Sequence, residues 1–388
     1  MPVATQGEQH HHQRESPWSW LLAFIGVIGA VIALSLVPEK AHHAAAQTWT
    51  PFVLVSGLLL IGLVAEDDGL FRAAGHRLAR LGRHGLVFYL GAAVLITLVT
   101  ATLNLDTSVV FLTPVLISAA HQRGGGERPL LYGCLLLSNA SSLFLPGSNL
   151  TNLIVLGHQP RSGEAFLALM WPAALVACVV TACCVGIWGR RDLVSVATLP
   201  PPAERPRLGL GLAAVSVATV LVVVLSSPAL PVLAVGLVAG TTRVWQHRVG
   251  SQRALDTLGV PVLVGLFGLT VALGALGRAW DGPVHLLSHA DGVATALLAA
   301  AATVLINNLP AAALLAARAP HHASDLLVGL NLGPNLGVTG SLAWFLWLRV
   351  ARTSGAKPSI AQASRLGLVV VPLSLAAALG ALALAGSG

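Results

Sequence analysis

The sequence predicts an all-α polytopic membrane protein built from two inverted repeats, each with a re-entrant hairpin and a broken transmembrane helix. Of the 388 residues, 55% are hydrophobic and 10% are charged, and the mean hydropathy is +0.79. Polar residues interrupt long apolar runs at 104–107 and at 145–153, and fainter copies of both interruptions occur at 306–310 and 332–340. Because unpaired backbone groups are costly in hydrocarbon, such breaks are expected only against protein or a water-filled cavity.

The first predicted repeat occupies residues 18–188 and follows a polar, cytoplasmic tail at 1–17. Its apolar segments approach or exceed the ~20 helical residues that cross a bilayer core. The expected elements are spans at 18–37 and 50–65, an interfacial helix within 66–85, the hairpin 86–120, the broken helix 129–157 and a closing span at 165–188.

A linker at 189–207, which contains three consecutive prolines, separates the two halves because polar and Pro-rich stretches interrupt helices. The second unit covers 208–386 and begins with a connecting helix at 208–225. Its other expected elements are spans at 229–242 and 257–277, the hairpin 292–319, the broken helix 326–350 and a final span at 364–385.

The distribution of basic residues predicts the orientation, because short cytoplasmic loops are enriched in Lys and Arg. With the N-terminus inside and both interrupted pairs as hairpins, 18 of the 22 Lys and Arg residues lie inside and four lie outside. The first hairpin then enters from the cytoplasm and the second from outside, which makes the halves inverted repeats. The net charge of +7 follows from orientation in the cell membrane, so no nucleic-acid partner is expected.

Neither a cofactor nor a metal site is expected. The four cysteines lie in apolar segments without metal-binding spacing, and the 14 histidines lie in tails, loops or span ends. A membrane enzyme such as a lipid transferase would need paired carboxylates and Mg²⁺. The one acidic cluster, Glu66-Asp67-Asp68, sits at the end of a span, so an enzyme remains a remote alternative.

The two predicted helix breaks carry neutral polar side chains. A cut helix exposes N–H groups at one end, which attract anions, and carbonyls at the other, which with Asn and Thr oxygens coordinate cations. The candidate residues are Ser148, Asn149, Thr151 and Asn152 in the first half, and Asn335 and Thr339 in the second. Proline kinks with locally satisfied polar groups are the alternative. Because each break is partnered with an Asn-bearing hairpin tip, we favour a binding site.

The hairpin tips add Asn104, Asp106 and Thr107 in the first half and Asn307 and Asn308 in the second. Asp106 is the only carboxylate well inside an apolar stretch. An intramembrane carboxylate is costly and marks an ion or proton pathway by default. We therefore expect Asp106 to carry the coupling ion, with a protonated or amide-paired structural aspartate as the alternative.

Four segments resemble motifs of the arsenite-efflux pump membrane subunits and of related permeases. That superfamily also includes the citrate and sodium–dicarboxylate carriers. The segments are LNLDTSVVFLTP at 103–114, GSNLTNL at 147–153, NNLP at 307–310 and GPNLGVTGS at 333–341. The resemblance covers most of residues 18–386 and implies an elevator-type carrier, often dimeric, in which hairpins and broken helices form the moving domain.

The hairpin tips depart from the dicarboxylate carriers, which have Ser-Asn-Thr at both positions. The tips here read Asn-Leu-Asp-Thr and Asn-Asn-Leu-Pro, which favours the arsenite-like branch. We therefore expect a secondary active transporter that couples efflux of arsenite, or a related small oxyanion, to protons through Asp106. Neutral As(OH)₃ suits a site of Asn, Ser and Thr groups.

The alternative within transport is a cation-coupled carrier of an organic or inorganic anion, similar to the citrate and dicarboxylate carriers. The expected partners are the lipid bilayer, the small anion substrate and protons or sodium as the coupling ion. A second copy of the chain in a homodimer and a soluble ATPase subunit on the cytoplasmic loops are further expectations.

Overall fold

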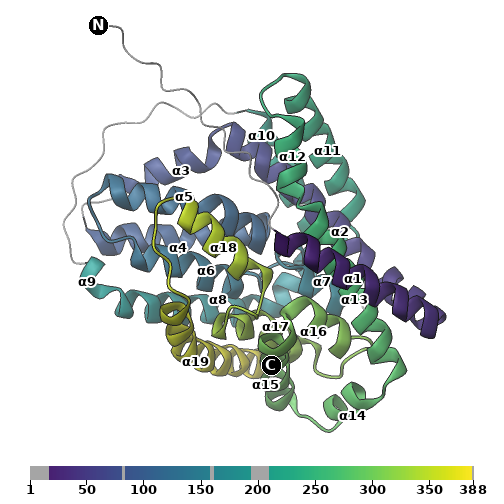
Figure 1. Ribbon diagram of the computed structural model, residues 1–388. Coiled ribbons are helices and arrows are strands. Elements are labelled where there is room, and N and C mark those ends of the chain that lie inside the picture. Colours follow the sequence, from purple (N-terminus) through teal and green to yellow (C-terminus); the bar gives the residue numbers. More distant parts are fainter. Residues whose placement is uncertain (1–16, 81–83, 158–160, 194–208, 387–388) are drawn as a thin grey trace, which may run out of the picture.

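The computed structural model describes residues 17–80, 84–157, 161–193 and 209–386, and these residues contain helices and no β-strand (Figure 1). Within them, six helices are long and apolar enough to cross a membrane by length and composition. The predicted all-helical class is therefore confirmed. The predicted tail at 1–17, apart from Pro17, and the linker after 193 lie outside the described residues.

The helices of the first half follow the predicted order. They are α1 (Pro17–Leu36), α2 (Pro38–Asp67), α3 (Leu70–Ala79), α4 (Gly85–Thr102), α5 (Leu105–Gln122), α6 (Arg128–Ser141), the short 3₁₀ helix η1 (Pro146–Ser148), α7 (Leu150–Leu156), α8 (Gly163–Trp188) and α9 (Arg190–Leu193).

The second half contains two short helices that the sequence analysis did not anticipate, α12 and α14. Its elements are α10 (Leu210–Val224), α11 (Ala229–Trp245), α12 (Ser251–Leu258), α13 (Val260–Ala279), α14 (Gly282–Ser288), α15 (Gly292–Ile306), α16 (Asn308–Leu315), α17 (Ala323–Leu332), the 3₁₀ helix η2 (Gly333–Leu336), α18 (Leu342–Thr353) and α19 (Ile360–Gly386).

Helix α2 begins well before the predicted span at 50–65, because its polar first third is also helical and packed. Ala41 and Ala44 are fully buried there, and the Thr48 hydroxyl donates to the Ala44 carbonyl at 2.8 Å. Polar side chains of this segment therefore reach positions inside the protein.

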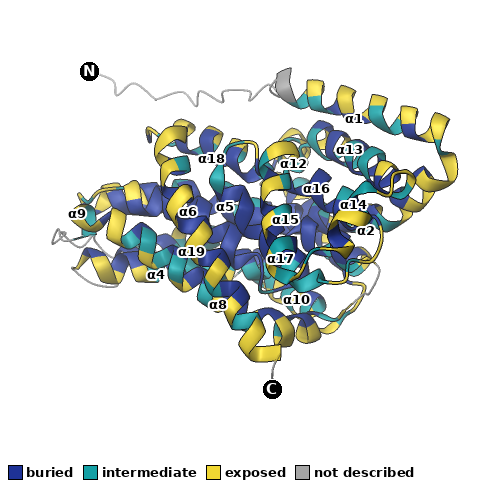
Figure 2. Ribbon diagram, turned by 90° about the horizontal axis from the view of Figure 1, so that it is seen from below, coloured by how far each residue is buried: buried dark blue, intermediate teal, exposed yellow. Residues whose placement is uncertain are grey.

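The outer faces of the helices are apolar, as a bilayer requires. On α1, Trp20 is 61% exposed and Phe24 is 63% exposed. Exposed faces also line the outside of α4 and α8, whereas the centre of the molecule is buried (Figure 2). Contiguous exposed apolar surface of this extent would promote aggregation in water, whereas it is compatible with contact to lipid hydrocarbon.

One set of helices, called the first helix group, consists of α1, α2, α10, α11 and α13, which pack on one another. Glycines allow their backbones to approach closely: a Cβ on Gly26 of α1 would lie 2.0 Å from the Gly265 carbonyl oxygen of α13. A Cβ on Gly57 of α2 would similarly lie 2.8 Å from the backbone of Leu233 in α11. Small residues at such crossings are the usual basis of tight helix packing in membranes.

The second helix group consists of α4–α8 and α15–α19 and holds both hairpins and both broken helices. Its contacts relate the two halves symmetrically: the closing helices α8 and α19 pack together, and the second hairpin arm of each half packs against the second part of the other half's broken helix, α5 against α18 and α16 against α7. The half-to-half pairing supports the predicted repeat, while its inverted orientation stays a prediction.

The acidic cluster at the end of α2 is neutralised by arginines. Arg243 of α11 forms a buried ion pair with Asp68 and lies 3.6 Å from Asp67. Arg253 lies 2.8 Å from Glu66, and the Gly211 N–H donates to Asp68 at 2.6 Å. These carboxylates therefore hold α2, α10, α11 and α12 together, which argues against their use as Mg²⁺ ligands.

Candidate functional site

The tip of the first hairpin is buried and retains polar atoms without partners. Helix α4 ends at Thr102 and α5 begins at Leu105, and the Asn104 side chain caps α5 by accepting from the Thr107 N–H at 2.6 Å. Asn104 Nδ2 and Thr107 Oγ1 are buried and make no hydrogen bond within the described residues. Because an unpaired buried polar atom costs about 1–3 kcal/mol, these two atoms mark a candidate contact for a ligand.

The second hairpin tip has the same construction and is more open. Asn307 lies at φ 76°, in the left-handed region, and its Nδ2 donates to the Thr339 carbonyl at 3.1 Å. The Asn308 N–H donates to the Gly340 carbonyl at 2.9 Å. Thr339 is exposed, whereas Asn308 is buried, so this tip lies partly at the surface.

Each tip is tied to the break in its own half by an equivalent hydrogen bond. The Ser148 hydroxyl donates to the Ala101 carbonyl at 3.0 Å, and the Thr339 hydroxyl donates to the Val304 carbonyl at 2.6 Å. Ala101 and Val304 both lie three residues before the tip asparagine. The hairpin and the broken helix thus form one unit in each half.

The first helix break runs from Ser142 to Asn149, between α6 and α7. Asn149 caps α7 by accepting from the Thr151 N–H at 3.1 Å. The Asn152 Nδ2 donates back across the break to the Ser142 carbonyl at 2.7 Å. The Thr151 hydroxyl is buried and has no partner among the described residues, so it joins Asn104 and Thr107 as a candidate contact.

Asn331 of α17 joins the two broken helices. Its Oδ1 accepts from the Asn149 Nδ2 at 2.8 Å and from the Ser142 Oγ at 2.5 Å. Its Nδ2 donates to the Asn152 Oδ1 at 2.8 Å and to the Leu327 carbonyl at 2.8 Å. Asn331 is fully buried, and every hydrogen-bonding capacity of its amide is used.

A second amide pair crosses between the same helices. Asn139 of α6 donates to the Asn335 Oδ1 of η2 at 2.9 Å, and the Asn335 Nδ2 donates to the Leu136 carbonyl at 3.1 Å. Both side chains are fully buried. The set of Asn139, Ser142, Asn149, Asn152, Asn331 and Asn335 is called the amide cluster below.

The structure unites only part of the predicted site. Asn149 and Asn152 both bond to Asn331, whereas Asn335 bonds to Asn139 in the other pair of the amide cluster. Ser148 connects the first break to the first hairpin. Asn307 bonds to the Thr339 carbonyl and Asn308 to the Gly340 carbonyl, and within the described residues no hydrogen bond joins this tip to the amide cluster.

Asp106 stands apart from the amide cluster. It is half-buried on the face of α5 that also carries the half-buried Val110 and Pro114, and no described residue hydrogen-bonds to its carboxylate. By contrast, the adjacent Thr107 faces α2, where a Cβ on Gly62 would lie 2.7 Å from its methyl group. Asp106 therefore has no ion-pair partner in the described chain.

Sequence reasoning missed Asn139, Ser142 and Asn331. Asn139 and Asn331 lie within regular helix, in the apolar segments LLLSNAS and LLVGLNL, before the interrupted stretches in which the site residues were sought. Only the polarity of these two asparagines could have identified them from the sequence, because a buried amide in an apolar helix needs partners on a neighbouring helix.

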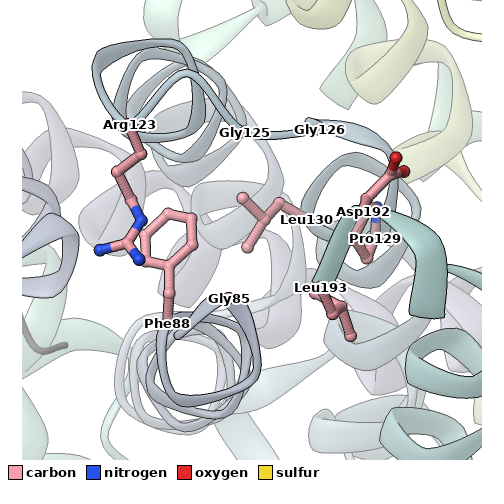
Figure 3. Close-up of a pocket in the computed structure, with 9 residues that line it drawn as sticks. All are labelled: Gly85, Phe88, Arg123, Gly125, Gly126, Pro129, Leu130, Asp192 and Leu193. Atoms are coloured by element: carbon pink, nitrogen blue, oxygen red, sulfur yellow. The ribbon is translucent and has the colours of Figure 1, made fainter. Parts of the chain in front are cut away.

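A small cavity of about 20 Å³ lies at the open end of the first hairpin, away from the breaks (Figure 3). The Arg123 guanidinium sits 4.5 Å from the centre of the Phe88 ring and donates to the Ala79 carbonyl at 2.5 Å. Asp192 of α9 faces the glycine loop there (Figure 3). The cavity holds about one water, so this region closes the hairpin rather than binding a substrate.

Comparison with known proteins gives one family and several relatives. A family model described as citrate transporter matches residues 15–348. The arsenical pump membrane protein of Escherichia coli (strain K12) is 24% identical over 403 residues, which cover 95% of this chain and 93% of that protein. The silicon efflux transporter LSI3 of Oryza sativa subsp. japonica is 27% identical over 150 residues, which cover 38% of this chain and 31% of that protein.

A solved structure has a similar fold. The YdaH transporter of Alcanivorax borkumensis, described as having an unusual topology, superposes with a TM-score of 0.53. The match covers 95% of this chain and 97% of that chain at 16% sequence identity. The likeness confirms the overall fold.

Proposed function

Because the chain belongs to the citrate transporter family, a family of membrane transporters, we propose that it is a proton-coupled secondary transporter that exports arsenite or a related small oxyanion. The observation that carries this proposal is the chemistry of the breaks: the amide cluster consists of neutral amides and a hydroxyl. None of its described hydrogen-bond partners is a charged side chain. Such donors and acceptors suit a small neutral solute with several hydroxyl groups, such as As(OH)₃.

Two relatives support this substrate class. The names of the bacterial and plant proteins refer to an arsenical pump and to silicon efflux, and both elements are metalloids that form neutral hydroxides near neutral pH. A citrate-like polyanion would need compensating positive charge at the breaks. Helix N-termini or bound sodium would have to supply that charge.

Within the site we propose two roles. Asn104 Nδ2, Thr107 Oγ1 and Thr151 Oγ1 contact the substrate, since these buried atoms lack protein partners in the described chain. The amide cluster fixes the positions of the broken helix ends beside these three atoms. The second hairpin tip, with Asn307, Asn308 and Thr339, controls access to the site from the side on which that hairpin lies.

We further propose that Asp106 exchanges the coupling proton. Its carboxylate is half-buried in a membrane helix and has no ion-pair partner among the described residues, so it can change charge without disrupting a salt bridge. We propose that the chain lies in the cell membrane with its N-terminus inside, as its basic residues predict. A homodimer and a soluble ATPase subunit remain predictions.

The family description keeps one alternative open, namely cation-coupled transport of citrate or a similar anion. Everted membrane vesicles that contain the chain separate the two. We expect arsenite uptake that depends on an imposed proton gradient, is abolished by a protonophore and does not require sodium. Vesicles that lack the chain provide the control. Uptake of labelled citrate without uptake of arsenite would refute the metalloid proposal and support the alternative.

A further inference from the structure

Gln47 of α2 hydrogen-bonds to the ends of two helices from different halves of the chain. Its Nε2 donates to the Ile154 carbonyl of α7 at 3.0 Å and to the Ala316 carbonyl at the end of α16 at 3.3 Å. The Ile154 carbonyl also accepts from the Gly157 N–H at 3.2 Å, so the Gln47 amide is its second partner. The Gln47 amide thus bonds to one carbonyl from each of the short helices α7 and α16, called the short arms below. Both bonds exist together only while both arms end against α2.

Arg278 of α13 fixes the position of the Gln47 amide. Its guanidinium donates to the Gln47 Oε1 and, at 2.8 Å, to the Gly274 carbonyl. Arg278 is half-buried and forms no ion pair with a carboxylate among the described residues. The negative ends of the α7 and α16 dipoles instead favour a cation at this place.

The surrounding contacts are tight. A Cβ on Gly157, directly after α7, would lie 2.7 Å from the Gln47 Cγ. A Cβ on Gly277 of α13 would lie 2.5 Å from the Leu314 carbonyl oxygen of α16. The first helix group therefore seals the ends of both short arms without room for a side chain between them.

We propose that Gln47 and Arg278 form a latch that closes this end of the candidate site and opens once in every transport cycle. The proposal rests on the proposed function, because a site reached alternately from two sides requires one bundle to move against the other. Helices α2 and α13 belong to the first helix group, whereas α7 and α16 belong to the second. Both bonds of Gln47 to the arms cross the boundary between these groups, and the Arg278 bond orients Gln47 for them.

A disulfide across the latch tests the movement. Gln47→Cys and Gly157→Cys are combined in a variant whose four native cysteines are replaced by Ala or Ser, and the short separation lies within reach of a disulfide. Oxidation should stop transport, and reduction should restore it.

Gly29→Cys with Ala272→Cys is the matched control, because a Cβ on Gly29 would lie 3.2 Å from the Ala272 Cβ and both helices belong to the first group. Its disulfide should leave transport intact. Full transport by the oxidised 47–157 variant, with the disulfide verified by mass spectrometry, would overturn the latch.

A second measurement needs no substrate. Val155→Cys places a thiol at a buried position on α7, next to the latch. Adding Gln47→Leu keeps the side-chain size but removes both bonds to the arms. An impermeant thiol reagent should then label residue 155 about tenfold faster, because losing both hydrogen bonds shifts the population toward the open state.

Ser56→Ala, which removes only a local hydrogen bond to Phe52 within α2, should leave the labelling rate unchanged. Equal rates with Gln47 and Leu at position 47 would also overturn the proposal. A chain that fails to move arsenite but shows the expected labelling would refute the substrate and retain the latch.

Discussion

Asn331 shows how one buried side chain can organise a site to which residues nearly half the chain away contribute. Its amide contacts Asn149 and Asn152 across separations of 182 and 179 residues. A satisfied amide in a desolvated core fixes the relative position of both broken helices, because every alternative arrangement leaves polar atoms unpaired. The sequence around 333–341 indicates a break, but the partners of Asn331 depend on tertiary packing.

Replacing Asn331 by Ala should weaken both the site and the protein. The change removes one partner each from Ser142, Asn149 and Asn152. It leaves the Asn152 Oδ1 without a hydrogen bond in the described chain, and an unpaired buried group costs about 1–3 kcal/mol. We expect the apparent KM for arsenite to rise at least tenfold and the thermal unfolding midpoint to fall. Both are measured on purified protein and in vesicles.

Thr48→Ala is the matched control for Asn331, since it removes one local hydrogen bond from a comparably buried position. It should lower the unfolding midpoint slightly and leave KM unchanged. An unaltered KM for Asn331→Ala would restrict Asn331 to a structural role.

Asp106→Asn separates proton coupling from substrate binding. Asn keeps the size and polarity of the side chain but cannot exchange a proton. Gradient-driven export should therefore vanish, whereas exchange of unlabelled for labelled substrate should persist and lose its dependence on pH. Parallel flux assays at several pH values with the wild-type chain provide the comparison.

Two other outcomes of these flux assays would give Asp106 a different role. If it ligates a cation needed for binding, exchange should fall as well and recover partly in excess cation. Gradient-driven, pH-dependent export at the wild-type rate would show that Asp106 does not carry the proton.

At the scale of elements, polar interruptions in apolar runs lie where helices end, whereas the re-entrant path of the hairpins stays a prediction. The predicted hairpin 86–120 corresponds to α4 and α5, and the expected break at 145–153 overlaps the observed one at 142–149. Prolines alone were a poor guide, because Pro51, Pro114, Pro172 and Pro372 all lie inside continuous helices. A membrane helix tolerates proline where neighbouring groups satisfy the freed carbonyl, and sequence does not reveal those neighbours.

At the two hairpin tips, the sequence pattern predicts the capping asparagine but not how exposed each tip is. An asparagine at each tip was expected, and both cap the following helix. Their unequal exposure was not foreseen, because burial of the first tip depends on Gly62 of α2 and has no counterpart in the tip sequence itself.

At the scale of the whole molecule, the contacts between helix ends fall into two sets. One set contains the end of α2 with Arg243, the open end of the first hairpin beside α9, and Tyr132 with Gln362 of α19. The other contains Gln47 and Arg278 with the ends of α7 and α16. The first set consists of helix ends predicted to be cytoplasmic and the second of helix ends predicted to be external, with 18 and four basic residues respectively on the two sides; the orientation itself stays a prediction.

Cysteine labelling of intact cells tests this orientation and, with it, the inverted repeat. Gln122→Cys, at the end of the first hairpin, and Ser251→Cys, at the start of α12, are exposed positions expected on the cytoplasmic side. Ser288→Cys, at the end of α14, is an exposed position expected outside. An impermeant maleimide should therefore label residue 288 in intact cells and residues 122 and 251 only after permeabilisation.

The native Cys183 is exposed and must first be replaced, so that the background is unreactive. Labelling of residue 251 but not of 288 in intact cells would reverse the whole orientation and leave the repeats inverted. Labelling of residue 122 from outside, with residue 251 still inside, would instead show that segment 86–120 crosses the membrane. The first hairpin would then not be re-entrant, and the parallel between the two halves would be lost.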